Sequence, residues 1–351
     1  MLIRLLEIAA GYPRLLRVLA ALMVSAMLLF LVDNFFVYWT EWPGIGAFLT
    51  HQGLLTPARN FKALEGFPLI AGWIQFLLFA ATLLLVVWWV IRTPGRDMDD
   101  DGRLFDALAS YFTRMAFWAV LLVGLADSVI SFLRVEGFLP YIVGDHLTTQ
   151  LGRSIFRGTW VHYPLVGIAA VIALFSRSIG FIWLSLMIVA AEFTIVISRF
   201  VFSYEQAFQG DVVRFWYAGL FLFASAYTLM HDGHVRVDVL YTNFSERGQA
   251  VTNALGSLLL GLPLCWTIMI LGTGSRGSII ISPLLSYEIS QSGFGMYTKY
   301  LMAAYLMVFA LTMGIQFVSF FLSNMARFTV PRDETDERLA EPGGAPRGVE
   351  A

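Results

Sequence analysis

Few residues of this chain stand in a pattern that could carry out chemistry. A hydrolase needs a nucleophile beside a base, and the sequence contains neither an HExxH nor a GxSxG motif. No glycine-rich phosphate loop follows a strand-like run, which argues against an ATP-driven pump. The sequence therefore predicts no catalytic residue, no cofactor and no enzymatic activity.

The densest polar cluster is a run that reads His-Asp-Gly-His-Val-Arg-Val-Asp over residues 231–238. His231, His234 and Asp238 have the i, i+3, i+7 spacing of one helical face, and this residue set could bind a metal ion. Gly233 disfavours a regular helix there, and no cysteine stands near, so we expect no metal site. We interpret His234, Arg236 and Asp238 as a charged corner that contacts a partner.

The composition predicts an integral membrane protein. Hydrophobic residues make up 58% of the 351 residues and charged residues 14%, against about 25% charged residues in a typical soluble domain. The apolar residues form runs near or above the ~18 residues that cross a hydrocarbon core as a helix. The net charge of −2, without a basic stripe, excludes nucleic acid as a partner. The lipids of the bilayer must act as the solvent.

The predicted fold class is all-α, with about eight transmembrane helices. These helices are expected over residues 15–39, 67–91, 111–133, 160–176, 180–203, 212–230, 249–272 and 297–322. The fourth is short, and only Ser176, Arg177 and Ser178 separate it from the fifth. A single broken or re-entrant segment across this region is therefore the alternative.

Three segments outside these helices have distinct compositions. Residues 136–157 show helical spacing of apolar residues and predict an amphipathic helix, which lies in the membrane interface or covers the end of the bundle. The charged residues 92–106 predict a solvated cytoplasmic loop. Residues 326–351 are acidic and aperiodic and predict a disordered cytoplasmic tail. The distribution of arginine and lysine favours a cytoplasmic location for both termini.

Ionisable residues inside the predicted helices are candidates for function, because their burial in lipid costs free energy. Glu192 and Arg199 are seven residues apart and share a helical face. Asp211 and Arg214 are within reach of each other on the next helix, and Arg199 could face Asp211. We interpret these pairs as fixing the packing of the helices, and the alternative is a path for substrate or ions. The remaining residues of this kind are Asp33, Arg114 and Asp127.

A haem site would place histidines in the middle of the membrane on facing helices. The five histidines instead lie at or beyond the ends of the predicted helices, at positions 51, 146, 162, 231 and 234. The sequence therefore predicts no haem.

The run Tyr-Thr-Leu-Met-His-Asp-Gly-His-Val-Arg-Val-Asp-Val-Leu-Tyr over residues 227–241 resembles a known family signature. It is similar to that of the DctQ-type small membrane subunit of TRAP transporters, the tripartite ATP-independent periplasmic systems. The resemblance covers residues 178–325. It also rests on Arg199-Phe200, on Asp211 with Arg214, on Ser245-Glu-Arg247, and on Gly314-Ile-Gln316.

The sequence departs from this family in two respects. The usual small subunit has about four membrane helices, whereas this chain is expected to have about four more in residues 1–177. Asp211 stands where the family often has a glutamate pair. We therefore predict three regions: an extra N-terminal membrane region (1–177), a DctQ-like four-helix domain (178–325) and the tail (326–351).

The resemblance implies an accessory subunit of a symporter in the inner membrane of a bacterium. In such systems a periplasmic solute-binding protein captures an organic acid or related solute, and the large permease subunit moves it with a sodium gradient. The small subunit packs against the large one, and the corner of His234, Arg236 and Asp238 would organise that contact. Two other classes stay open: a self-sufficient secondary transporter or channel, with Asp127, Glu192, Arg199 and Asp211 along its path, and a membrane redox or metal enzyme.

Overall fold

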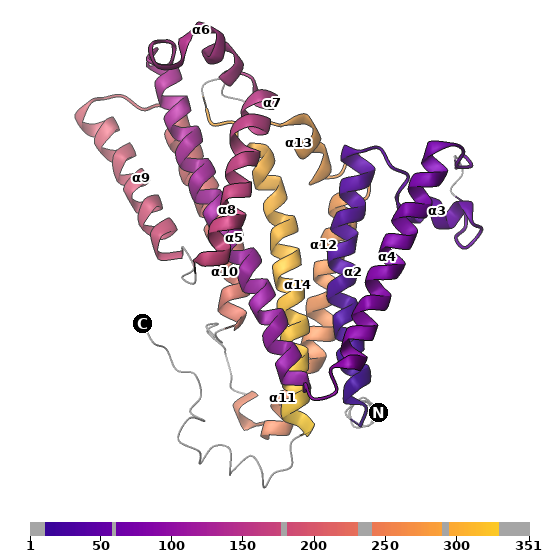
Figure 1. Cartoon of the computed structure of the whole chain (residues 1–351). Helices are drawn as coiled ribbons and strands as arrows, with labels where there is room; N and C mark the ends of the chain where they lie inside the picture. Colours follow the sequence, from indigo (N-terminus) through magenta and orange to yellow (C-terminus); the bar gives the residue numbers. More distant parts are fainter. Residues whose placement is uncertain (1–10, 58–60, 177–180, 231–240, 290–294, 330–351) are drawn as a thin grey trace.

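The computed structural model of the chain describes residues 11–57, 61–176, 181–230, 241–289 and 295–329. These residues form an all-helical bundle in which no strand occurs, and eight of its helices are long and apolar enough to cross a membrane (Figure 1). The predicted fold class and number of spans are therefore confirmed. The eight are α2 (Pro13–Trp39), α4 (Phe67–Arg92), α5 (Met98–Val135), the run of α7, η1 and α8 (Ser154–Phe175), α9 (Phe181–Val201), α10 (Ala207–Met230), the run of α11, η3 and α12 (Glu246–Thr273) and α14 (Lys299–Thr329).

Shorter helices lie outside the spans. Helices α3 (Gly44–His51), α6 (Leu139–Leu151) and α13 (Ile281–Ser286) lie at one end of the bundle, drawn at the top of Figure 1. The start of α2 and the end of α14 lie at the opposite end, where the short turn η2 (Tyr241–Asn243) leads into α11. Both ends of the described chain are therefore on the same side, as an even number of spans requires.

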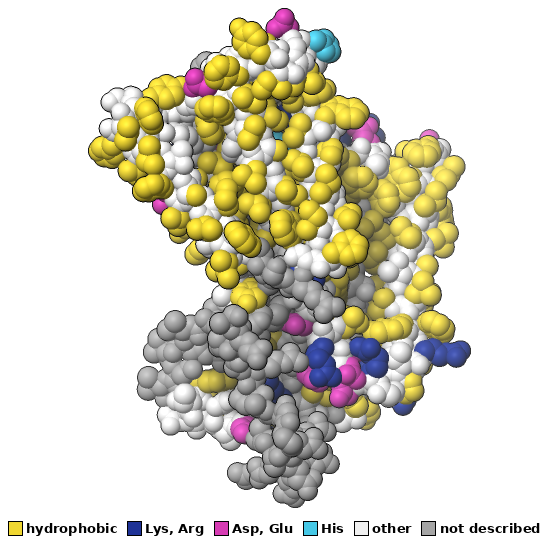
Figure 2. Space-filling view, turned by 60° about the vertical axis from the view of Figure 1, so that its left-hand side comes forward, with side chains coloured by type: hydrophobic (Ala, Val, Ile, Leu, Met, Phe, Trp, Pro, Cys, Tyr) yellow, Lys and Arg dark blue, Asp and Glu magenta, His cyan; other side chains and the backbone are white. Residues whose placement is uncertain are grey.

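Helix α14 is the central helix of the bundle and contacts α2, α5, α10, α11 and α12. Half of its most apolar stretch is buried (50%), the largest share among the eight described spans, whereas α9 is the least buried at 11%. One apolar cluster joins Met27 of α2 and Met269 of α12 to α14, and a second joins α5, α9 and α10 to Tyr305 of α14. The outer surface is also largely apolar, as expected of a protein whose solvent is lipid (Figure 2).

Helices α5 and α10 pack closely because a glycine faces a tryptophan. A Cβ atom on Gly124 of α5 would overlap Nε1 of Trp216, which is 3% exposed. Trp216 Nε1 donates a hydrogen bond to the carbonyl oxygen of Val120, one turn away on α5, at 3.1 Å. The absence of a side chain at Gly124 therefore lets the indole reach its hydrogen-bond partner.

The third span begins much earlier than residue 111, so the predicted solvated loop over 92–106 is wrong. Asp97 caps α5: its side chain accepts from the Asp100 backbone N–H at 2.7 Å, and the Asp100 side chain accepts from the Asp97 N–H at 3.2 Å. This reciprocal pair forms a capping box that starts the helix at Met98. Asp101 in its first turn is completely buried.

The amphipathic helix predicted over 136–157 is not continuous. Gly144 has φ 79° and ψ 164° and breaks α6, and α7 (Ser154–Arg157) belongs to the fourth span. Leu139 is buried, but Tyr141 is 88% exposed. Helical spacing identified the helical residues, whereas the backbone conformation of Gly144 breaks α6.

Two further boundaries differ from the prediction. The fourth span starts at Ser154 and runs through η1 (Gly158–His162) into α8 (Tyr163–Phe175), so it is a helix separate from α9 and not half of one broken segment. Residues 326–329 belong to α14, so this part of the tail is helical, and residues 330–351 lie outside the described residues. The division into three regions stays a prediction.

We predict that Gly124→Ala lowers the free energy of unfolding in detergent by about 1–3 kcal/mol, because the added methyl group displaces the Trp216 indole. Gly167→Ala on α8 is the matched control, since a Cβ atom there would meet nothing within 4 Å. Thermal unfolding of the two purified variants measures the difference. Equal stability of both variants would contradict the close α5–α10 contact.

Candidate functional site

The carboxylate of Asp127 on α5 is the centre of a buried polar cluster. Its Oδ1 atom accepts hydrogen bonds from Arg157 Nη1 at 2.9 Å and from His162 Nε2 at 3.0 Å. Its Oδ2 atom accepts the backbone N–H of Tyr297 at 2.8 Å. The side chains of Asp127, Arg157 and His162 are 0% exposed. A buried ion pair is tolerated when hydrogen bonds satisfy its remaining atoms, and this carboxylate meets that condition.

Arg157 is held on several sides. Its Nε donates to the carbonyl oxygen of Leu151 at 2.9 Å, and its Nη1 also donates to Ser131 Oγ at 3.1 Å. Its guanidinium lies over the ring of Tyr297, 4.1 Å from the ring centroid, a cation–π geometry. Only Nη2 of this arginine has no partner among the described residues. Arg157 therefore joins α5, the end of α6 and the segment before α14.

His162 extends the cluster to α14. Its Nδ1 lies 2.9 Å from the hydroxyl of Tyr300. The imidazole therefore bridges the Asp127 carboxylate and the Tyr300 hydroxyl. The turn before His162 is π-helical and contains Gly158, where a Cβ atom would overlap the ring of Tyr287. The fourth span can thus approach α14 closely enough for the histidine to bridge Asp127 and Tyr300.

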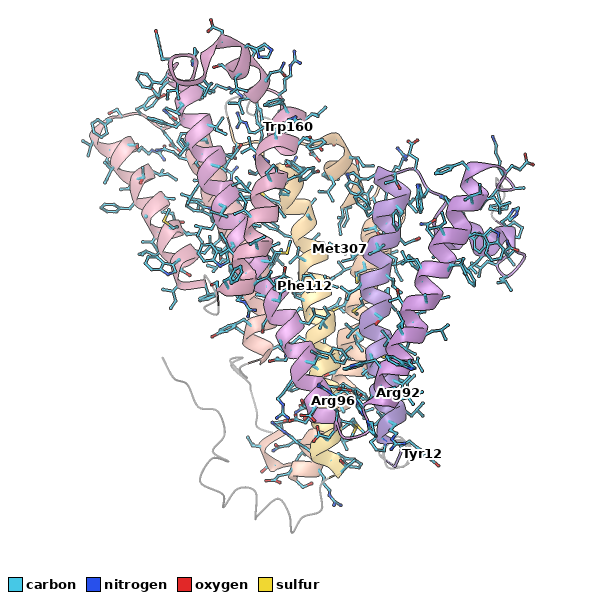
Figure 3. The ribbon with its side chains drawn as sticks, viewed as in Figure 1. Tyr12, Arg92, Arg96, Phe112, Trp160 and Met307 are labelled. Carbon is cyan, nitrogen blue, oxygen red and sulfur yellow. The ribbon has the colours of Figure 1, made fainter. Side chains whose placement is uncertain are left out.

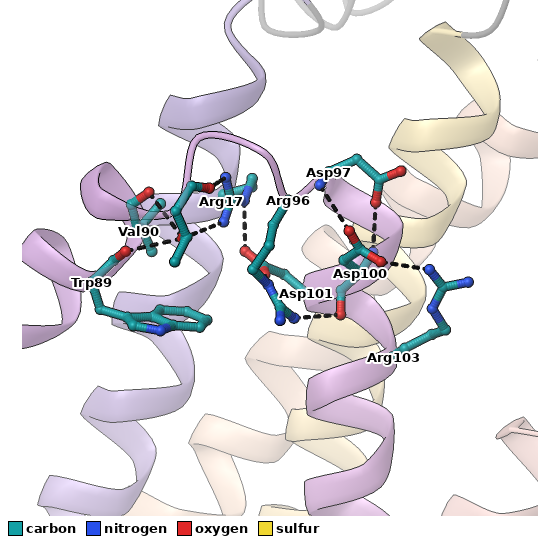
Figure 4. Close-up of polar contacts among 9 residues, drawn as sticks. Arg17, Trp89, Val90, Arg96, Asp97, Asp100, Asp101 and Arg103 are labelled. Atoms are coloured by element: carbon teal, nitrogen blue, oxygen red, sulfur yellow. Dashed lines mark hydrogen bonds and ion pairs between the residues drawn. The ribbon is translucent and has the colours of Figure 1, made fainter.

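A second buried carboxylate, that of Asp101, organises the opposite end of the bundle (Figure 4). Its Oδ2 accepts from Arg17 Nε of α2 at 2.7 Å, and its Oδ1 accepts from Arg96 Nε at 2.9 Å. Arg17 also donates to the carbonyl oxygen and to Oγ1 of Thr93, both at 3.0 Å. The two clusters lie far apart along the bundle: Arg96 is at the lower end of Figure 3, and Trp160, next to the first cluster in sequence, is near the upper end.

Helices α5 and α14 are further joined by a row of side-chain hydrogen bonds below the middle of the bundle. Gln316 Nε2 donates to Asp106 Oδ1 at 2.9 Å, and Ser319 Oγ donates to the carbonyl oxygen of Gly102 at 2.7 Å. Ser323 Oγ donates to Asp99 Oδ1 at 3.1 Å. The polar atoms of α5 are therefore used to hold α14.

The four predicted intramembrane residues do not form one site. Arg214 Nη1 lies 3.5 Å from Asp211 Oδ1, as the spacing predicted, and Asp211 also accepts the N–H of Met296 at 3.1 Å. Arg199 pairs with Glu205 at 4.0 Å, not with Asp211, because Glu205 stands in the connection directly after α9. Glu192 shares the exposed side of α9 with Arg199 and has no hydrogen bond or ion pair within the described ranges.

The corner of His234, Arg236 and Asp238 lies outside the described residues, and its role stays a prediction. The chain directly after it is tied to α14. Ser245 caps α11, and Asn253 of that helix donates both to the hydroxyl of Tyr241 at 2.8 Å and to Asn324 Oδ1 at 3.1 Å.

The partners of Asp127 were missed from the sequence. His162 was expected at or beyond a helix end but lies inside the fourth span, and Arg157 was placed in the amphipathic segment. Asp127 itself was the available signal, since a carboxylate inside a membrane needs a cation nearby. Arg157 and His162, five residues apart beside the weakest predicted span, are such partners.

The polar groups of the described clusters are mostly engaged in hydrogen bonds with one another. The Asp127 carboxylate is closed off by its own donors, and no group of three metal-ligating side chains occurs within the described ranges. Asp127 is buried between α5, α7 and α14, whereas Glu192 and Arg199 are exposed on α9. These residues do not line a common path, so the arrangement favours a structural role over a route for solute.

Comparison with known proteins gives one match. Residues 186–327 match the family described as tripartite ATP-independent periplasmic transporters, DctQ component, over less than half of the 351-residue chain. This match confirms the resemblance for the last four spans, and we call the matched residues 186–327 the DctQ-type domain. No curated protein and no solved structure matches the chain.

We predict that Asp127→Asn lowers the free energy of unfolding by about 3–5 kcal/mol, because it leaves the Arg157 charge buried without a counter-charge. Glu41→Gln is the control: its pair with Arg276 is exposed, and its loss changes stability by less than about 1 kcal/mol. Chemical denaturation in detergent measures both. The double variant Asp127→Asn with Arg157→Gln should recover part of the loss, and strict additivity of the two changes would contradict the pairing.

Proposed function

We propose that this chain, whose residues 186–327 form a DctQ-type domain, is the small membrane subunit of a TRAP-type secondary transporter and has no turnover of its own. It supports a large permease subunit that takes up an organic acid or related solute with a sodium gradient. A periplasmic solute-binding protein delivers the solute. The family match carries this proposal.

The use of charge inside the bundle supports a scaffold role. The carboxylates of Asp127 and Asp101 each accept hydrogen bonds from two basic side chains. Both aspartates lie on α5, which packs along α14. A helix held by buried ion pairs at both of its ends resists the rearrangement that alternating access requires. A fixed frame beside a moving partner needs this rigidity.

The proposed location is the inner membrane of a bacterium, with both termini in the cytoplasm. The end of the bundle where α2 begins carries many arginines, and cytoplasmic segments are enriched in such residues. The arginines at this end that the structure describes are Arg14, Arg17, Arg92, Arg96, Arg103, Arg247 and Arg327. Figure 2 shows charged side chains gathered at its lower right, in contrast to the apolar surface above them.

Co-purification tests the proposal. An affinity-tagged copy of the chain, expressed with its genomic neighbours, should isolate a large multi-spanning permease at a constant ratio. Liposomes that contain this chain alone should show no solute uptake driven by a sodium gradient. Flux through the chain alone would support a self-sufficient transporter, and repeated isolation without a permease would overturn the subunit assignment.

We predict that Arg236→Ala reduces the amount of co-purified permease, or uptake by the complex, at least tenfold while membrane insertion stays normal. The physical reason is loss of a charged contact at the corner that follows α10; a buried charged contact is worth about 2–5 kcal/mol. Arg92→Ala is the control, because it removes an exposed arginine from the same end of the bundle. Equal assembly and uptake in both variants would make Arg236 a topology signal only.

A further inference from the structure

Helix α9 is attached to the bundle along a narrow contact. Only Leu184 and Ile188 of its 21 residues are buried, and its apolar stretch is buried less than that of any other described span. The remaining face of α9 is either exposed to lipid or covered by another protein.

Glu192 distinguishes these two cases. It is residue 12 of α9 and therefore lies about 16 Å from one end of the helix and about 14 Å from the other, given a rise of ~1.5 Å per residue. Its side chain is exposed and has no hydrogen bond or ion pair among the described residues. An ionised carboxylate at this depth in lipid costs at least about 2.5 kcal/mol, so such a residue normally faces a partner.

A groove runs between α9 and α10 beside this face. It has a volume of about 320 Å³ and is lined by Phe181 at the start of α9 and by residues of α10. The residues on α10 include Tyr217, Phe221, Ser225 and Thr228, whose spacing places them on one helical face. Phe221 is 68% exposed and Tyr217 is 59% exposed. We call this feature the α9–α10 groove.

Glu192 lies on the same face of α9 as the wall of the groove. Phe181 and Glu192 are eleven residues apart, which is three helical turns plus about 20°. A helix that lay along the α9–α10 groove would therefore pass Glu192 about three turns from Phe181. Small and polar residues such as Ser225 let two helices approach closely within a membrane.

We propose that the α9–α10 groove is the docking surface for a transmembrane helix of the large permease subunit, and that this helix carries a lysine or arginine at the depth of Glu192. The inference rests on the proposed function for the identity of the partner. The Glu192 carboxylate, which has no partner within the described ranges, specifies the charge of the partner helix, and the row of α10 residues specifies its helical form. The whole surface belongs to two helices that lie almost entirely in the DctQ-type domain.

A second copy of this chain fits the surface less well. Two copies with the same orientation in a membrane are related by an axis along the membrane normal, which brings identical residues to the same depth. Glu192 would then face Glu192 of the other copy, and like charges in this environment repel each other. A different protein with a cation at that depth avoids this cost.

The test uses the complex that the tagged chain isolates. Glu192→Leu should reduce the co-purified permease at least tenfold, whereas Glu205→Gln, which removes an exposed carboxylate after the end of α9, should leave it unchanged. Ser225→Trp fills the groove and should act like Glu192→Leu. Its control is Ala190→Trp, on an exposed position about 160° around α9 from Glu192.

The isolated chain provides a check on folding. Because Glu192→Leu replaces a lipid-exposed carboxylate with an apolar side chain, its unfolding temperature without the permease should equal or exceed that of the unchanged chain. Weaker assembly together with unchanged or higher stability supports the docking surface. The docking surface is overturned if the unsubstituted chain isolates the permease and the Glu192→Leu and Ser225→Trp variants isolate the same amount.

A photoreactive residue at Phe221 identifies the occupant. Cross-linking to the permease at Phe221, but not at Ala190, supports the proposal, and cross-linking to a second copy of this chain overturns it. If the unchanged chain never isolates a permease, the proposed function itself fails. The two failures are therefore distinguishable.

Discussion

A carboxylate enclosed in a membrane bundle must find its counter-charge and its hydrogen bonds within the protein, and the position of Asp127 on α5 imposes this constraint on its neighbours. Arg157 and His162 meet Oδ1, and the backbone of Tyr297 meets Oδ2. The fourth span must therefore enter the bundle at Arg157, and the chain before α14 must pass beside α5. These three contacts join α5 to the fourth span and to the segment before α14.

Helix α5 ties the helices that precede the DctQ-type domain to that domain. Helix α5 lies outside the matched residues 186–327, yet it packs against both α10 and α14 of the domain. At one end of α5, Asp101 accepts a hydrogen bond from Arg17 of α2. Further along α5, its polar atoms accept hydrogen bonds from side chains of α14. The extra helices therefore brace the central helix of the domain, because α14 shares its buried polar partners with them.

Glu192 differs from these carboxylates because it has no hydrogen bond or ion pair within the part of the chain that the structure describes. The two most buried carboxylates are paired inside the bundle, but Glu192 lies exposed on the helix that is held least. Buried ion pairs in the interior and an exposed carboxylate on α9 agree with the proposed role as a supporting subunit.

The sequence by itself determined the class of the protein, the number of spans and the resemblance of the C-terminal part to a known family. These depend on local composition, on the length of apolar runs and on a contiguous motif, all of which are readable without contacts. The tertiary structure alone decided the partners of each charge. In the sequence Arg157 and His162 stand near the end of a predicted helix, but in the structure both donate hydrogen bonds to Asp127. Asp101 stands in a segment predicted to be solvated, but Arg17, 84 positions earlier, pairs with its buried carboxylate. Ion pairing depends on distances between helices remote in sequence, and these distances follow only from the packing of the whole bundle.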